Sequence, residues 1–196
     1  VYSRLAAKGV EDKFRFGLVG FRDNVEAAPG ADYVTRVFND LNGSGGNRDL
    51  LAKIDAMAPA ETPTVDWRED AFAGLRTAAY DLDWGQVDAR IVILITDASA
   101  RAETDDKARH KMFGAWSVRA IMDQNDISVF AVHLRTEEAR RVAGEAERVR
   151  GQVQYRTLGR YLPVEGDTTR AFGRALDSME NLLVQTLSDA AAGREI

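Results

Sequence analysis

A run of five aliphatic residues over positions 91–95 ends directly in Thr96 and Asp97. Uninterrupted aliphatic runs of this length are typical of strands buried on both faces, and such strands occur mainly in parallel sheets covered by helices. A second run of the same kind lies over 127–134, after a predicted helix over 111–123 in which we expect Trp116 to pack inside. Strands of this type alternating with helices predict an α/β chain.

The rest of the sequence extends this alternation. Aromatic and apolar residues over 14–21, and alternating ones over 33–38, predict a pair of strands joined by a turn. Small and apolar residues recur at helical spacing between Asp66 and Leu82, which predicts a helix capped by Asp66 with Glu69 three residues on. Further helices are predicted over 137–150 and 169–192, and a last strand over 153–158.

This order of elements predicts a Rossmann-like, doubly wound and mostly parallel sheet with helices on both faces. Residues 1–196 form a single domain, because no linker or repeat divides them. No central strand precedes the first strand pair, although residues 1–8 resemble the helix that would follow such a strand in the chain. The chain also starts without Met. We therefore expect a fragment of a longer polypeptide that carries the first central strand elsewhere.

Composition excludes several classes of protein. The net charge of −5 argues against a nucleic-acid binder, which usually presents a basic face. No apolar window is long enough to cross a membrane, so direct insertion is not expected. The chain has no Cys and only two His, His110 and His133, which removes thiol chemistry and makes a histidine-rich zinc site improbable. We expect His133, in the middle of a predicted strand, to be a core or edge residue.

Acidic and hydroxyl side chains follow the predicted strands. Asp97 and Asp23 each follow a strand directly, Thr64 and Asp66 lie in the loop before a helix, and Ser99 follows Asp97. Ligands of open α/β sheets bind at the carboxyl ends of the strands, and Mg²⁺ prefers oxygen ligands. These residues are therefore candidates for a metal site, with Asp23 and Ser99 as contacts on the same rim. Each also has a structural explanation: turn or helix caps for the aspartates, and an ordinary loop position for Thr64.

Motifs of catalysis and phosphate binding are absent from the sequence: it contains no GxSxG, GxxxxGK[ST], GxGxxG or HExxH. We name no catalytic residue and expect the domain not to be an enzyme. A metal-dependent hydrolase that uses the same acids is the alternative, but it would need a general base that the sequence does not provide.

Three segments in order carry a family resemblance: "FRFGLVGFRDN", "TPTVDWREDAFAGLRTAAYDLDW" and "ARIVILITDASA". They resemble successive parts of a von Willebrand factor A (vWA) domain. The pieces "VHLRTEEAR" and "QYRTLG" make the chain most similar to the vWA region of bacterial serine/threonine protein kinases associated with type VI secretion.

The resemblance implies a Rossmann-like fold and a metal-ion-dependent adhesion site that holds Mg²⁺ or Mn²⁺. In such a site Asp97 would be the aspartate after the fourth strand. Thr64, or else Asp66, would be the ligand from the second loop. The first element of the site, DxSxS, does not occur in these residues. Either it lies upstream of Val1 or this member lacks the metal site, so the site is incomplete in this chain.

The resemblance also implies a function. We expect a docking or sensing domain that binds a protein partner, such as a component of the secretion apparatus, at the rim around Asp97. A kinase domain would lie elsewhere in the polypeptide. This domain would be either cytoplasmic or the periplasmic part of a membrane-anchored kinase. A purely structural assembly module is a further alternative, and the oligomeric state stays open.

Overall fold

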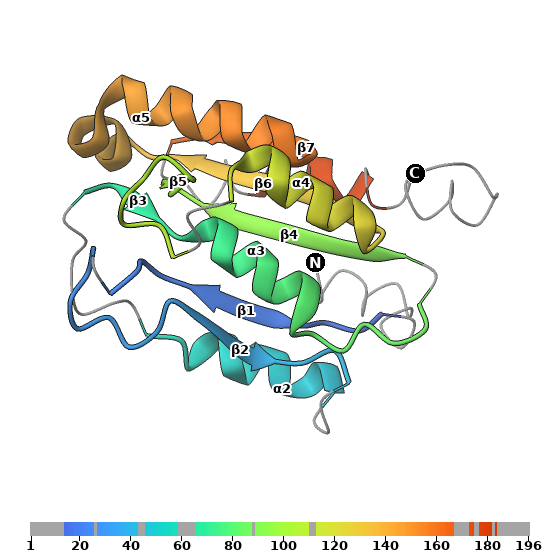
Figure 1. Cartoon of the computed structure of the whole chain (residues 1–196). Helices are drawn as coiled ribbons and strands as arrows, with labels where there is room; N and C mark the ends of the chain where they lie inside the picture. The colour runs from blue at the N-terminus through green and yellow to red at the C-terminus, as the bar shows by residue number, and fades with distance from the viewer. Residues whose placement is uncertain are drawn as a thin grey trace.

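The aliphatic run over 91–95 forms the centre of β4, Arg90–Thr96, in the computed structural model of the chain (Figure 1). β4 pairs in parallel with β6, Ile127–Arg135, and β6 pairs in parallel with β7, Arg160–Glu165. The prediction of parallel strands joined by helices is thus confirmed. The structure describes residues 14–25, 27–42, 46–58, 66–87, 89–109, 113–166, 173–174, 177–181 and 183.

The two predicted amino-terminal strands form an antiparallel hairpin. β1, Leu18–Phe21, pairs with β2, Thr35–Asn39, and α2, Gly46–Asp55, lies beside β2. In Figure 1 the arrows of β1, β4 and β6 all point the same way, so their carboxyl ends share one edge. Within the described residues no hydrogen-bond ladder joins β1 to β4, and the hairpin and the parallel sheet are separate sheets.

A second small sheet lies next to the end of β4. β3, Arg68–Glu69, pairs in parallel with β5, Ser99–Ala100. The backbone N–H of Asp70 donates to the carbonyl of Arg22 at 3.0 Å, and that of Arg101 donates to the carbonyl of Glu69 at 2.9 Å. The loops that follow β1 and β4 are therefore held against the segment that leads into α3.

Helices cover one face of the parallel sheet, and Met179 packs against the other face. α3, Ala71–Tyr80, α4, Ala115–Gln124, and α5, Glu137–Leu158, contact each other in series and cover one face. Side chains alternate along a strand. Val129 and Ala131 of β6 accordingly face this helical layer, whereas Phe130 and Val132 belong to a second cluster with Met179. β6 is thus buried on both faces.

β4 is less buried than its sequence predicts. Ile95 is 45% exposed, and Ile91, Val92 and Ile93 are only partly buried. β6 has a hydrogen-bonded neighbour on each side, whereas β4 pairs only with β6 among the described residues. The aliphatic run is thus typical of a strand buried on both faces, but the described neighbours of β4 bury it only in part.

Three local predictions were wrong. Residues 153–158, predicted as a strand, form the end of α5, because Gly151, Tyr155 and Leu158 recur at helical spacing and are buried together. Helix α3 starts with Asp70 as its N-cap, so Asp66 does not cap it. Trp116, expected to pack inside, is 78% exposed on α4.

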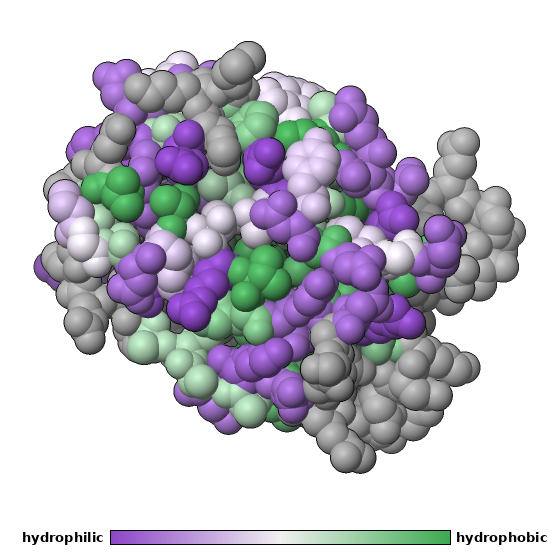
Figure 2. Space-filling view, turned by 60° about the horizontal axis from the view of Figure 1, so that its bottom comes forward, coloured by the Kyte–Doolittle hydropathy of each residue, from purple (hydrophilic) through white to green (hydrophobic). Residues whose placement is uncertain are grey.

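The surface of the molecule is mixed in character. Figure 2 shows hydrophilic side chains interspersed with small hydrophobic areas on the face that it presents. Within the described residues, no helix has the length and apolar character that a membrane crossing requires. The helices predicted over 1–8 and 169–192 lie wholly or mostly outside the described residues.

Candidate functional site

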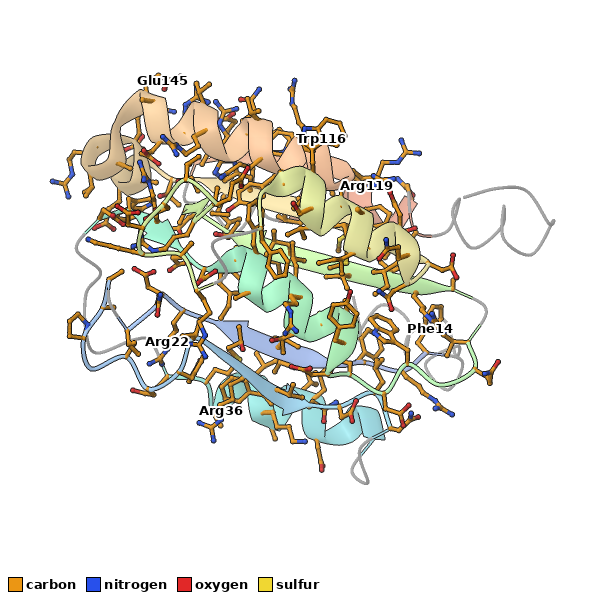
Figure 3. All side chains as sticks on the ribbon, in the orientation of Figure 1. Phe14, Arg22, Arg36, Trp116, Arg119 and Glu145 are labelled. Atoms are coloured by element: carbon orange, nitrogen blue, oxygen red, sulfur yellow. The ribbon has the colours of Figure 1, made fainter. Side chains whose placement is uncertain are left out.

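The carboxyl ends of β1, β4 and β6 form one rim, which carries most of the described residues that the sequence nominated. Arg22 at the end of β1 and Glu145 on α5 both lie toward this edge in Figure 3. Asp23, Asp66, Asp97 and Ser99 are described here, whereas Thr64 lies outside the described residues. The aspartates do not converge on one point, because Asp23 and Asp66 form ion pairs with an arginine.

That arginine is Arg101, directly after β5. Its side chain is fully buried, as is that of Asp23, and the two form a bidentate ion pair in which Nη2 lies 2.6 Å from Oδ2. Asp66 accepts from the same Nη2 at 2.8 Å, and Asp105 accepts from Nη1 at 2.9 Å. Although burial opposes the charged form, these carboxylates raise the pKa of Arg101 above its ordinary value.

A second arginine extends this cluster toward α5. Arg68 of β3 donates to both carboxylate oxygens of Glu147, with Nη2 at 2.6 Å from Oε1, and to Asp105 at 3.2 Å. The hydrogen bond from Arg68 lowers the pKa of Glu147. We call the set of Asp23, Asp66, Arg68, Arg101, Asp105 and Glu147 the arginine network. It ties together the segments after β1, before α3 and after β5, and the helix α5.

Asp97 stands apart from the arginine network. Its backbone carbonyl accepts from Nε1 of Trp67 at 3.2 Å, and its side chain is partly buried. Burial raises the pKa of Asp97, with a further contribution from the charge of Glu138. The pKa of Glu69 is also raised, to about 7. Burial is the largest cause, and the negative charges of Asp97 and Asp23 add to it. Asp97 and Glu69 are thus two acids that resist being ionised together.

Two further side chains at the rim have structural partners. The Ser99 hydroxyl donates to Oε2 of Glu147 at 2.7 Å. His133 is buried, as expected, and its Nδ1 lies 3.0 Å from the hydroxyl of Tyr161. Burial, helped by the charge of Arg135, lowers the pKa of His133 to about 4, so the ring is neutral at pH 7.

The described donors do not by themselves suit the divalent metal that a vWA-like site implies. Asp23 and Asp66 are engaged by the Arg101 guanidinium, and the Ser99 hydroxyl by Glu147. Only Asp97 and Glu69 are left near each other, and the part of the chain described here holds no cluster of three or more metal-ligating side chains. A complete metal site would need Thr64, which lies outside the described residues, and a DxSxS segment, which the sequence does not contain.

Sequence reasoning missed the residues that organise the rim. Glu69 was assigned to a helix cap, and Arg101 and Arg68 were not considered at all. The available signal was that Arg68 lies two residues from Asp66 and Arg101 two residues from Ser99, and that a buried acid needs a cation near it. Spacing alone does not reveal which acid a long arginine side chain will reach.

Comparison with known proteins supports the fold. The chain is similar to the crystal structure of the conserved hypothetical protein BatB from Bacteroides thetaiotaomicron, with a TM-score of 0.50 and 14% identity. The match covers 96% of this chain and 86% of that one. That protein has a vWA-like fold. No family model matches the chain, and no curated protein does. The likeness therefore assigns a vWA-like α/β fold and nothing more specific.

Proposed function

We propose that this chain is a non-catalytic interaction domain that docks a protein partner on the rim formed by the carboxyl ends of β1, β4 and β6. The observation that carries the proposal is the arginine network. One buried ion pair and several partly buried ones join four segments of the rim, and charged side chains such as Asp66, Glu138 and Arg140 are exposed around it. A charged and rigidly held surface favours specific docking, since little ordering is needed on binding.

The resemblance to vWA regions of type VI secretion-associated kinases gives this proposal its finer form. There the partner would be a component of the secretion apparatus, and the domain would report its presence to a kinase domain in the same polypeptide. A central strand ending in DxSxS, placed between β1 and β4, would add the remaining ligands of a Mg²⁺ or Mn²⁺ site. Asp97 and Thr64 would then be its other ligands.

Site-specific photo-crosslinking in the native host tests the proposal. A photoreactive residue at Arg140 or Asp66 probes the rim, and the same residue at Gln124 probes the opposite end of the sheet as a matched control. All three positions are exposed. We expect adducts with one defined protein from the rim positions and none from position 124. Adducts from position 124 alone would overturn the proposal.

A hydrolase is the second candidate, and Glu69 is the observation in its favour. A carboxyl group whose pKa is about 7 is suited to act as a general base at neutral pH. Turnover of a phosphoester substrate with Mg²⁺, lost in both Glu69→Gln and Asp97→Asn, would favour this candidate. Turnover that survives in both variants would indicate a contaminating enzyme.

A further inference from the structure

An exposed apolar strip lies on the outer surface of α4 and α5, on the side turned away from the sheet. It consists of Trp116 of α4, which is 78% exposed, and of Val149 and Val153 of α5, which are 44% and 61% exposed. In Figure 3 Trp116 lies at the start of α4, beside α5. Tryptophan is largely buried in most proteins and is enriched at protein interfaces. The α4–α5 strip is therefore a candidate interface.

Arg119 fixes the position of Trp116 relative to α5. It lies one turn after Trp116 and donates from Nη1 to the carbonyl of Leu158, the last residue of α5, at 3.1 Å. The two helices run in the same direction in Figure 1. Trp116 therefore lies beside the second half of α5, to which Val149 and Val153 also belong.

Charged side chains flank the two valines along α5. Successive residues of an α-helix are about 100° apart around its axis, so Glu145 and Arg156 lie on the same side of α5, about three turns from each other. Val149 and Val153 come between them in the chain. Glu145 accepts from Nε of Arg148 at 2.6 Å, but its side chain is 61% exposed. A carboxylate in this position has acceptor sites for a second cation.

The arginines of this surface differ in position and in partners. Arg156 is exposed, and its guanidinium lies over the ring of Tyr161 at 5.4 Å from the ring centroid. Arg150 lies about 120° around the helix from Arg156. Its Nε is 3.6 Å from Glu147 of the same chain. The cation on the same side as Glu145 is thus Arg156.

An antiparallel copy of α5 matches this order of charges and valines. With a two-fold axis at the middle of the valine pair, Val149 of one chain opposes Val153 of the other, and Glu145 opposes Arg156. Each contact forms twice, as in every isologous interface. A parallel copy would place Glu145 beside Glu145 and Arg156 beside Arg156, and like charges in such contacts are costly.

We propose that the α4–α5 strip is the interface of a homodimer, in which the α5 helices of two chains pack antiparallel and Glu145 of each chain pairs with Arg156 of the other. The inference goes beyond the proposed docking function and does not depend on it. Because the strip is short, we expect a reversible dimer with a Kd in the micromolar range.

Sedimentation velocity over a range of concentrations tests self-association. We expect the monomer at low concentration and a dimer at high concentration. A chain that stays monomeric up to about 1 mM would overturn the inference. Co-sedimentation of such a monomer with phosphatidylglycerol vesicles would assign the strip to a membrane surface instead.

Charge reversal tests the pairing. Glu145→Arg and Arg156→Glu should each raise the Kd roughly tenfold or more, because each change places like charges together at two symmetry-related contacts. An equimolar mixture of the two variants should form dimers again, since both contacts then join opposite charges. A folding defect would not give this result. A mixture that stays monomeric would overturn the pairing.

Two further variants separate this interface from other routes to association. Trp116→Ala should raise the Kd, because it removes the largest apolar side chain of the strip. Tyr80→Ala is the matched control, since Tyr80 is a 50% exposed aromatic residue on α3, outside the strip, and should leave the Kd unchanged. Self-association that survives both Trp116→Ala and Glu145→Arg would point to the unpaired edge of β4 and overturn the inference.

Discussion

Arg101 is the residue on which the geometry of the rim depends most. Its guanidinium is fully buried and reaches carboxylates from the loops after β1, before α3 and after β5. Replacing only one partner of a buried ion pair leaves the other as an uncompensated buried charge. Asp23, whose side chain is also fully buried, would be the acid left in that state.

Arg101→Met is therefore expected to lower the free energy of unfolding by about 3–5 kcal/mol. Urea unfolding followed by circular dichroism measures the loss. Arg119→Met is the control, since Arg119 pairs with the exposed Asp123 on the surface of α4 and should cost about 1 kcal/mol or less. Equal costs for the two substitutions would show that the buried network is not a special source of stability.

His133 makes the stability of the fold sensitive to acid. Its pKa is about 4 in the folded chain, against an ordinary value of 6.5, so the unfolded chain binds more protons between these values. The free energy of unfolding should fall as pH decreases from about 6.5 to 4, by about 3 kcal/mol from this residue. The test is the difference between the two proteins: His133→Leu should lose this contribution relative to the wild type, whatever the absolute stability of the variant, and should keep the opposite contribution of Glu69. An unchanged pH slope would contradict the assignment.

Glu69 has the opposite effect on stability. Its pKa is raised from 4.5 to about 7 on folding, so the folded chain holds a proton that the unfolded chain has released. The contribution of Glu69 to the free energy of unfolding should therefore fall by about 3 kcal/mol as pH increases from about 4.5 to 7, and it opposes the contribution of His133 over part of this range. Glu69→Gln should remove this loss and stabilise the chain at pH 7.5 relative to the wild type. Chemical unfolding at pH 4.5 and 7.5 checks this, and destabilisation at pH 7.5 would contradict it.

At the scale of elements, the sequence predicts strands and helices correctly where its hydrophobic pattern fits only one kind of element. The aliphatic runs of β4 and β6 and the small-residue face of α3 were identified, because periodicity and burial agree there. The strand predicted over 153–158 was wrong: valine and tyrosine favour strands, but here Val153 is exposed and Tyr155 packs with Leu158 at helical spacing in the end of α5. The arginine network could not be predicted, because long side chains cross between elements that periodicity does not place.

Gly144 illustrates a local feature that periodicity conceals. It lies within α5 at φ 79°, ψ 172°, a backbone region that is essentially restricted to glycine. A Cβ there would meet no atom within 4 Å, so a substitution is opposed by backbone strain alone. Gly144→Ala should destabilise the chain by about 1–3 kcal/mol in urea unfolding, although alanine is the better helix former. Stabilisation would mean that α5 straightens without cost.

At the scale of the whole molecule, the hairpin of β1 and β2 and the parallel sheet of β4, β6 and β7 are joined by helix α3 and by the arginine network, and no described strand ladder connects them. Phe72 and Leu75 of α3 pack in the core that includes Leu94 of β4, and Phe21 of β1 packs against the same core. β1 and β4 share no hydrogen bonds in the described structure, and Ile95 is half-exposed. Unpaired strand edges promote association, so proteins usually cover or pair them.

Hydrogen exchange distinguishes a paired from an unpaired edge of β4. In this chain we expect alternate amides of β4, those pointing away from β6, to exchange much faster than the amides bonded to β6. The amides of β6 over 130–133 should all be protected, because β6 pairs on both sides there. Amide exchange measured residue by residue by NMR provides the readout.

A longer polypeptide that adds the expected central strand before Val1 completes this test. If the upstream segment supplies the expected central strand, the fast amides of β4 should become protected, and Ile95 should lose its exposure. The matching amides of β1 should slow as well, because one inserted strand pairs with both edges. Protection of β7, which lies on the far side of β6, should stay the same in both proteins. Uniform protection of β4 already in the shorter chain would refute the unpaired edge.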